Sequence, residues 1–346
     1  MSATHRSFPA GWTSPCRETA RRGWQRLGTY LARRLAQSLL VLVLISVATF
    51  TIIHLSPGGP EVLLTGDLSP ADREYIIRNL GLDRPLHVQF ARWFGAALRG
   101  DFGRSFNQQR PVRDVIRERL PATVLLAAAS LVLAIALGVP LGVAAARRPN
   151  SWVDYSATGI SVLGVSVPSF WLGILLILLF SLRWRLLPSS GMATLGAEFS
   201  LVDLFRHMVM PTVVLSLVYL AQIASYTRAS MLDVMQRDYV RTARAKGVRE
   251  RIVLFHHALR NGLIPVITVV GLLIPRLVGG AAITETIFSW PGMGRLAVEA
   301  AFKRDYPLVM GTTVVFALAV IASNLLVDVF YGLVDPRIKV GGGEEA

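Results

Sequence analysis

The residues best suited to binding chemistry form one basic stretch, RTARAKGVRERIVLFHHALRN, at positions 241–261. Its arginines can donate charge-assisted hydrogen bonds, and apolar residues recur near a helical period on each side of Gly247. These apolar positions are Val240, Ala243, Val248, Ile252, Phe255 and Leu259. Glycine suits the left-handed residue that ends a helix. The pattern predicts a short helix, a sharp turn at Gly247 and a second short helix.

Two interpretations of this stretch stay open on its residues alone. A basic helix with an apolar face can lie on a membrane surface, attracted by anionic lipid. The same combination can dock into a groove on a partner protein, where the apolar face packs and the charges fix the register.

Other chemistry has less support. No segment has the G-x-x-x-x-G-K-[S/T] pattern that cradles nucleotide phosphates, so we expect no ATP site and no enzyme activity in this chain. Cys16 is the one cysteine, which excludes an internal disulfide. His256 and His257 are adjacent and would point about 100° apart on a helix, so they are poorly placed to share a metal. We predict no metal site and no bound cofactor.

Arg276 is a second candidate because it follows Pro275 inside an apolar stretch. A charge facing lipid there would cost at least about 2.5 kcal/mol, so the side chain should face protein or a watery pathway. One interpretation is a station on a solute pathway, together with Thr284 and Glu285. The other is an arginine bound to carbonyl groups or to a partner's carboxylate.

The elements that position these residues are predicted to be membrane helices. The 346 residues are 53% hydrophobic, and the formal net charge is +14. A helix needs about 20 apolar residues to span a bilayer. Six windows meet this length, which predicts an all-α polytopic membrane protein: residues 35–55, 122–146, 157–182, 209–227, 262–284 and 308–332.

The distribution of Lys and Arg predicts that both termini are cytoplasmic. Seven of these residues precede the first span and eight fall in 228–260, against three in each of the two short outer connections. The long outer loop is predicted to be partly helical. One helix would begin at Ser69 and end before Gly81, and a second would run over residues 85–99.

The predicted organisation has five parts. They are a cytoplasmic tail (1–34), a first membrane helix (35–55), an outer helical loop (56–121), a core of five helices (122–334) that contains the basic loop 228–261, and a cytoplasmic tail (335–346).

Several motifs in chain order resemble the dipeptide, oligopeptide and nickel branch of the ABC importer permeases. Besides RTARAKG and HALRN, these motifs are ARRL, SPGGP, GDFGRSF, RLPAT, SVPSFWLG, TETIFSWPGMGRL, RDYPLV and DPR. The family's cytoplasmic loop has a Glu-Ala-Ala, Gly and Ile-x-Leu-Pro pattern. Here Ala243, Gly247 and Leu259 fit it, whereas Arg241 and Arg260 replace the Glu and the Pro, and Thr242 and His257 occupy two further positions.

The resemblance implies a function for the basic loop. In the family this loop fits a cleft on a cytoplasmic ATPase, which would involve Arg241, Thr242, Ala243, Lys246, Gly247, His257, Leu259 and Arg260 here. It also implies a second homologous permease, two ATPases that hydrolyse ATP with Mg²⁺, an external substrate-binding protein, and a place in a bacterial or archaeal cytoplasmic membrane without contact to nucleic acid. An ion-coupled secondary transporter is the alternative, but it would need repeats and central carboxylates that the sequence does not show.

Overall fold

The computed structural model describes residues 15–55, 83–198 and 200–334. Within these ranges the chain is helical, apart from turns and a single bridge between Arg104 and Pro111. The longer helices are α1 (Pro15–Leu55), α3 (Leu86–Ala97), α4 (Val112–Arg147), α5 (Trp152–Ser166), α7 (Leu201–Met235), α10 (Leu259–Ile287), α11 (Met293–Phe302) and α12 (Tyr306–Val334).

The predicted all-α membrane architecture is confirmed. Among the described residues, five helical segments are long and apolar enough to cross a bilayer, and a sharply bent helix pair supplies a sixth span if it counts as one. The five segments are Arg33–Leu55, Val112–Arg147, Leu201–Met235, Glu250–Leu277 and Tyr306–Val327.

The third predicted span, 157–182, is wrong as a continuous helix. The chain instead forms α5, then α6 (Ser169–Leu176) and the π-helical η2 (Ile177–Arg183), with a bend of 100° between the two parts. The break lies at Val167 and Pro168. Proline disfavours the helical conformation of the residue before it, and Val167 is extended with φ −78° and ψ 121°.

Two helices begin earlier than the membrane spans predicted within them. α1 begins at Pro15, inside the predicted tail 1–34, and α4 begins at Val112, inside the predicted outer loop 56–121. α4 continues through Pro121 and Pro140 without ending. The predicted helix over 85–99 is confirmed as α3, whereas the helix predicted to begin at Ser69 and the tail 335–346 lie outside the described residues.

The centre of the bundle is the pair formed by α4 and α7. Gly138 and Gly142 lie one turn apart on α4 and face α7, where a Cβ at Gly142 would lie 2.5 Å from the carbonyl oxygen of Ala224. Small residues at this spacing let two membrane helices approach closely. The main core cluster extends from this pair to α10, with Leu126, Ile223 and other residues buried between the three helices.

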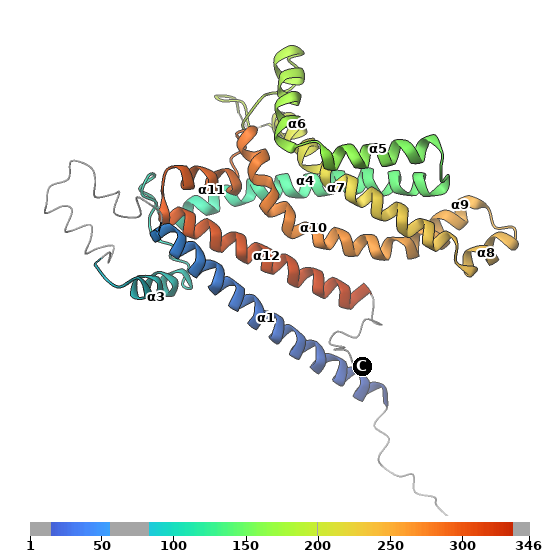
Figure 1. Ribbon diagram of the computed structural model, residues 1–346, viewed down its shortest axis with the longest axis horizontal. Helices are drawn as coiled ribbons and strands as arrows, with labels where there is room; N and C mark the ends of the chain where they lie inside the picture. Colours follow the sequence, from blue (N-terminus) through green and yellow to red (C-terminus); the bar gives the residue numbers. More distant parts are fainter. Residues whose placement is uncertain (1–14, 56–82, 199, 335–346) are drawn as a thin grey trace, which may run out of the picture.

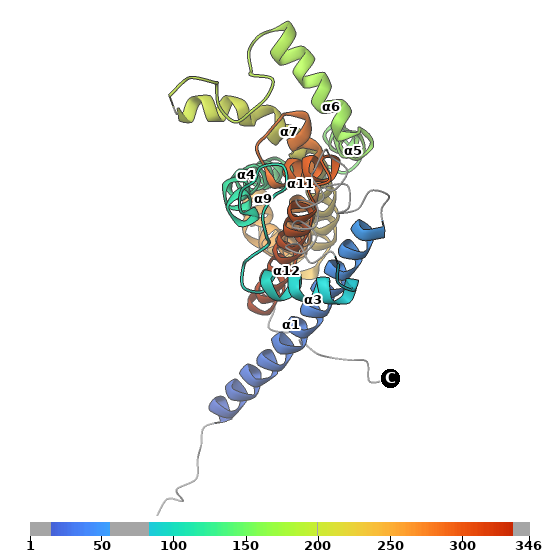
Figure 2. The same cartoon turned by 90° about the vertical axis from the view of Figure 1, so that its left-hand side faces the viewer.

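The bundle has two ends, which different short helices occupy (Figure 1). α8 (Asp238–Ala245) and α9 (Glu250–Ile252) lie at one end, named here the α8 end, and α3 and α11 lie at the opposite end, named the α11 end. Seen from the α11 end, α1 and α6 project to opposite sides of the central helices (Figure 2). α1 packs mainly along α12.

Candidate functional site

α8 and the turn after it form the predicted helix and sharp turn. Gly247 has φ +77°, the left-handed conformation expected there. Its N–H donates to the Arg244 carbonyl at 2.9 Å, and the Val248 N–H donates to the Ala243 carbonyl at 3.2 Å. These two bonds form the Schellman motif that closes a helix C-terminus. The turn direction is therefore fixed by backbone bonds.

α8 is seated on an apolar core. Its buried residues Val240 and Ala243 pack with Met231 and Val234 of α7 and with Val143 of α4. The same cluster includes buried residues just before α10. Because the cluster joins α4, α7, α8 and the start of α10, a force applied to α8 would reach three membrane helices.

The other face of α8 is open. Arg241, Thr242 and Lys246 are exposed, and the hydroxyl of Thr242 donates back to the Asp238 carbonyl at 2.8 Å. The Arg241 guanidinium reaches Asp238 only at 3.9 Å. This face leaves charged donors available to a partner.

One ion pair fixes α8 relative to α9. The Arg244 guanidinium donates to the Glu250 carboxylate at 2.8 and 3.2 Å, across the Gly247 turn. The hydrogen bond to Glu250 raises the pKa of Arg244 above its usual value, so the guanidinium stays charged.

The second half of the basic stretch differs from the prediction. Instead of a separate short helix, α9 and the π-helical η3 (Val253–Ala258) run directly into α10. Ile252 and Phe255, predicted on the packed face, are exposed, and Val253, Leu254 and Ala258 are buried. A π-helical turn holds an extra residue, which rotates the apolar face away from an α-helical period.

The predicted residues of the stretch therefore fall into two groups. Arg241, Thr242, Lys246 and Gly247 lie together on the exposed side of α8 and its turn, with Ala243 beneath them. The second group lies on η3 and the first turn of α10, where His257 and Leu259 are half-buried and Arg260 is exposed.

The α11 end contains a buried polar cluster. Glu285 is fully buried, and Thr123 Oγ1 of α4 donates to one of its carboxylate oxygens at 2.7 Å. The Arg295 N–H of α11 donates to the other oxygen at 3.0 Å. Because the Met293 N–H donates to Thr123 Oγ1 at 2.7 Å, the threonine hydrogen is left for Glu285. Side chains from α4 and α10 thus cap the N-terminus of α11, where a carboxylate is favoured.

Gly292 makes room for this carboxylate. A Cβ at Gly292 would lie 2.2 Å from the carboxyl carbon of Glu285. Trp290, also fully buried, donates its indole N–H to the Ala122 carbonyl at 2.9 Å. The segment between α10 and α11 is therefore fastened to α4 from both sides.

A second buried carboxylate ties the start of α12 to the segment before α4. Ser105 Oγ donates to Asp305 at 2.5 Å, and the N–H groups of Phe106 and Asn107 donate at 3.2 and 3.1 Å. Sequence reasoning did not single out Asp305, Ser105 or Thr123. These residues could have been found through the motifs that contain them, RDYPLV, GDFGRSF and RLPAT. Nothing in the sequence, however, shows which of these motifs are in contact.

The three predicted pathway residues are separated by the structure. Thr284 and Glu285 are buried within the chain. Arg276 is exposed and lies close enough to Tyr219 of α7 to interact electrostatically. It precedes Glu285 by nine residues, or about 13 Å of helix.

Comparison with known proteins identifies the family. Residues 138–340 match the family described as "Binding-protein-dependent transport system inner membrane component", and residues 27–127 match the N-terminal domain of the same membrane components. A crystal structure described as an amino acid ABC transporter with histidines aligns with a TM-score of 0.48 and 13% identity, covering 63% of this chain and 92% of that chain.

Two curated relatives align over nearly their whole length. The oligopeptide transport system permease protein AppB of Bacillus subtilis is 44% identical over 90% of this chain and 100% of the relative. The dipeptide transport system permease protein DppB of Escherichia coli is 38% identical over 90% of this chain and 98% of the relative. With matches of this extent, the chain belongs to the family of binding-protein-dependent transport system inner membrane components.

Proposed function

We propose that this chain forms half of the translocation pathway of an ATP-driven peptide importer, and that α8 transmits ATPase movement to the membrane helices. The names of the relatives support peptides as the solute class. The observation that carries the coupling role is the rigid seating of α8. Its buried side joins three membrane helices, while its exposed side presents Arg241, Thr242 and Lys246.

Family membership sets the general context. The chain is a multi-pass component of the bacterial inner membrane, and its family works with a substrate-binding protein and an ATPase. The relatives are transport permeases and give no support to an ion-coupled secondary transporter.

The proposed orientation places the α8 end in the cytoplasm and the α11 end outside. The excess of Lys and Arg in residues 228–260 supports this direction, since such residues concentrate in cytoplasmic loops. It puts α3 and α11 on the side where a substrate-binding protein arrives.

The proposed assembly contains a second homologous permease subunit and two ATPases. ATP and Mg²⁺ are bound and hydrolysed by the ATPases, because this chain has no phosphate-binding loop. The chain itself carries no cofactor and catalyses no reaction.

The proposed ATPase contact has a direct and a supporting part. Arg241, Thr242, Lys246 and Gly247 contact the ATPase from α8 and its turn, and Arg260 adds a second basic point. Ala243, His257 and Leu259 support these residues from the packed side.

Arg276 is proposed as a transient station for the carboxylate of a peptide. It is exposed on α10, and among the described residues no carboxylate lies within ion-pair distance of it. A guanidinium can hold a carboxylate by two hydrogen bonds. Thr284 and Glu285, being buried, belong to the wall behind such a pathway rather than to its surface.

Reconstitution tests the proposed function. The two permeases are placed in liposomes with the binding protein, and uptake of a labelled dipeptide and a labelled oligopeptide is measured with and without the ATPases. We expect uptake only with ATPase and ATP. Uptake driven by an ion gradient without ATPase would contradict the proposal.

A further inference from the structure

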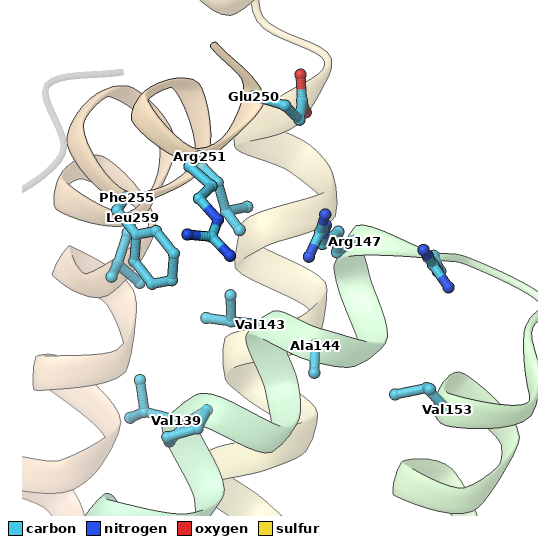
Figure 3. Close-up of a pocket in the computed structure, with 12 residues that line it drawn as sticks. Val139, Val143, Ala144, Arg147, Val153, Glu250, Arg251, Phe255 and Leu259 are labelled. Atoms are coloured by element: carbon cyan, nitrogen blue, oxygen red, sulfur yellow. The ribbon is translucent and has the colours of Figure 1, made fainter.

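A cavity of about 920 Å³ lies at the α8 end, between α4, the start of α5 and the segment from α9 to α10 (Figure 3). Its apolar side chains include Val139, Val143, Phe255 and Leu259. No residue of α8 lines this cavity, and Leu259 is the one residue of the proposed ATPase contact that does.

The cavity carries an excess of positive charge. Arg147, Arg148 and Arg251 line it, and among the described residues none of the three has a carboxylate within ion-pair distance. The lining carboxylate, Glu250, is already held by Arg244 through two hydrogen bonds. Figure 3 shows the carboxylate of Glu250 turned away from the guanidinium groups of Arg147 and Arg251. An anionic ligand would therefore meet unpaired guanidinium groups.

The charged residues of the cavity lie at the end of the α4 span, and its apolar residues lie deeper along the span. Arg147 is the last residue of α4, and Val139 precedes it by eight residues, or about 12 Å of helix toward the middle of the span. Phe255, which is 60% exposed, lines the cavity, and Trp152, which is 85% exposed, follows Arg148 by four residues. Exposed aromatic residues are typical of the membrane interface, where lipid headgroups lie.

We propose that this cavity binds an anionic phospholipid of the adjoining leaflet. Its phosphate accepts hydrogen bonds from Arg147, Arg148 and Arg251, and an acyl chain lies along Val143 and Val139. Basic pockets between membrane helices on the cytoplasmic side suit such headgroups. Arginine is the side chain best matched to phosphate oxygens. The proposal uses the proposed orientation of the chain in one respect only. The orientation determines which leaflet supplies the lipid.

The apolar depth favours a lipid over a soluble phosphate compound. A free phosphate would need only the three arginines and would leave the apolar wall facing water. The cavity also borders the core beneath α8, since Val143 and Leu254 belong to both. A bound lipid would thus brace the same helices that α8 moves.

The test is native mass spectrometry of the full chain, purified in detergent and titrated with phosphatidylglycerol or with phosphatidylcholine of the same acyl chains. We expect tighter binding of phosphatidylglycerol. The triple variant Arg147→Gln, Arg148→Gln, Arg251→Gln should weaken that binding at least about tenfold. Its matched control, Arg241→Gln, Arg249→Gln, Arg260→Gln, removes three exposed arginines outside the cavity and should bind as the unchanged chain does.

A second variant keeps every charge. Ala144 lines the cavity and is exposed, so Ala144→Trp should fill the space without disturbing a packed core. We expect it to displace phosphatidylglycerol as well. Full binding by Ala144→Trp, or equal losses in the two triple variants, would overturn the proposal in favour of general surface charge.

Two further measurements distinguish a phospholipid from other ligands of the cavity. Inorganic phosphate that competes with phosphatidylglycerol at equimolar concentration would overturn the lipid assignment, as would loss of lipid on addition of the ATPase. Lipid binding needs neither ATPase nor transport. It can therefore fail while ATP-driven uptake persists, or persist while uptake fails, so the two proposals are tested independently.

Discussion

The two ends of the bundle use their polar residues in opposite ways. At the α11 end, Glu285 and Asp305 are buried, and each accepts hydrogen bonds from segments distant in the sequence. At the α8 end, one buried carboxylate, Asp154, is paired with Arg228 of α7, but the cluster beneath α8 is apolar and the charged residues of α8 are exposed. The buried carboxylates of the α11 end are satisfied within one chain, whereas the exposed face of α8 leaves Arg241 and Lys246 for other molecules. This difference supports the proposed coupling contact at α8, in addition to the packing of α8 on three membrane helices.

The largest expected effect is at the α11 end. Glu285→Ala leaves the Arg295 N–H and the Thr123 hydroxyl without an acceptor in a buried site. Each unsatisfied buried group costs about 1–3 kcal/mol, so the two groups together should lower the free energy of unfolding by about 2–6 kcal/mol. The thermal unfolding of the purified chain in detergent measures this loss.

Gly292→Ala provides the control for that effect. Alone it should also destabilise, because its Cβ would collide with the Glu285 carboxylate. In a chain that already carries Glu285→Ala, Gly292→Ala should lower the free energy of unfolding much less, since the colliding carboxylate is gone. Additive effects of the two changes would contradict the assigned packing.

At the α8 end, Gly247→Val should impair coupling more than stability. A β-branched residue in the left-handed conformation costs about 1–3 kcal/mol and would misdirect α9. Membrane insertion should stay normal, and ATPase binding in a pull-down assay should weaken. Gly247→Asn is the control, since asparagine tolerates this conformation. If the Gly247→Val and Gly247→Asn variants bind the ATPase equally well, the turn has no role in coupling.

Arg276→Met tests the region between the two ends. The change keeps length and apolar bulk but removes the charge, so assembly with the second permease should survive. A lost charge-assisted hydrogen bond of about 1.4 kcal/mol would reduce uptake of a carboxylate-bearing peptide about tenfold. A peptide amide should be less affected. Failed assembly would instead assign Arg276 to a subunit interface, and unchanged uptake would remove it from the pathway.

The smallest expected effect on stability is at the ion pair between Arg244 and Glu250. Both side chains are partly exposed, and such pairs contribute less than about 1 kcal/mol. Arg244→Glu should therefore leave unfolding nearly unchanged but reduce ATPase binding. Adding Glu250→Arg should restore that binding. No rescue by the reversed pair would show that Arg244 acts on the ATPase directly.

The sequence predicted the features that depend on local patterns. Apolar windows found the spans, and Gly247 was correctly placed in a left-handed turn. The break at Val167 and Pro168 was missed because hydropathy continues smoothly across it, although proline carried the signal. The buried face of η3 differs from the α-helical prediction because this segment is π-helical, and no local sequence pattern predicted the π-helical turn.

Contacts between motifs far apart in the chain could not be predicted from the sequence, for a different reason. Glu285 was predicted as a pathway residue, but Thr123 and the N-terminus of α11 enclose it. Thr123 and Glu285 are 162 positions apart, and only the packing of α4 against α10 and α11 brings them together. A single sequence names such residues without showing which of them meet.

Site-specific cross-linking tests the central claim most directly. Lys246 and Lys303 are exposed lysines, one at each end of the bundle. With Cys16 changed to serine, a photoreactive maleimide is attached to Lys246→Cys or to Lys303→Cys in the assembled transporter. We predict that the probe at position 246 captures the ATPase and that the probe at 303 captures the substrate-binding protein. Capture of the ATPase from 303, or its absence from 246, would contradict the assignment of the α8 end as the coupling surface.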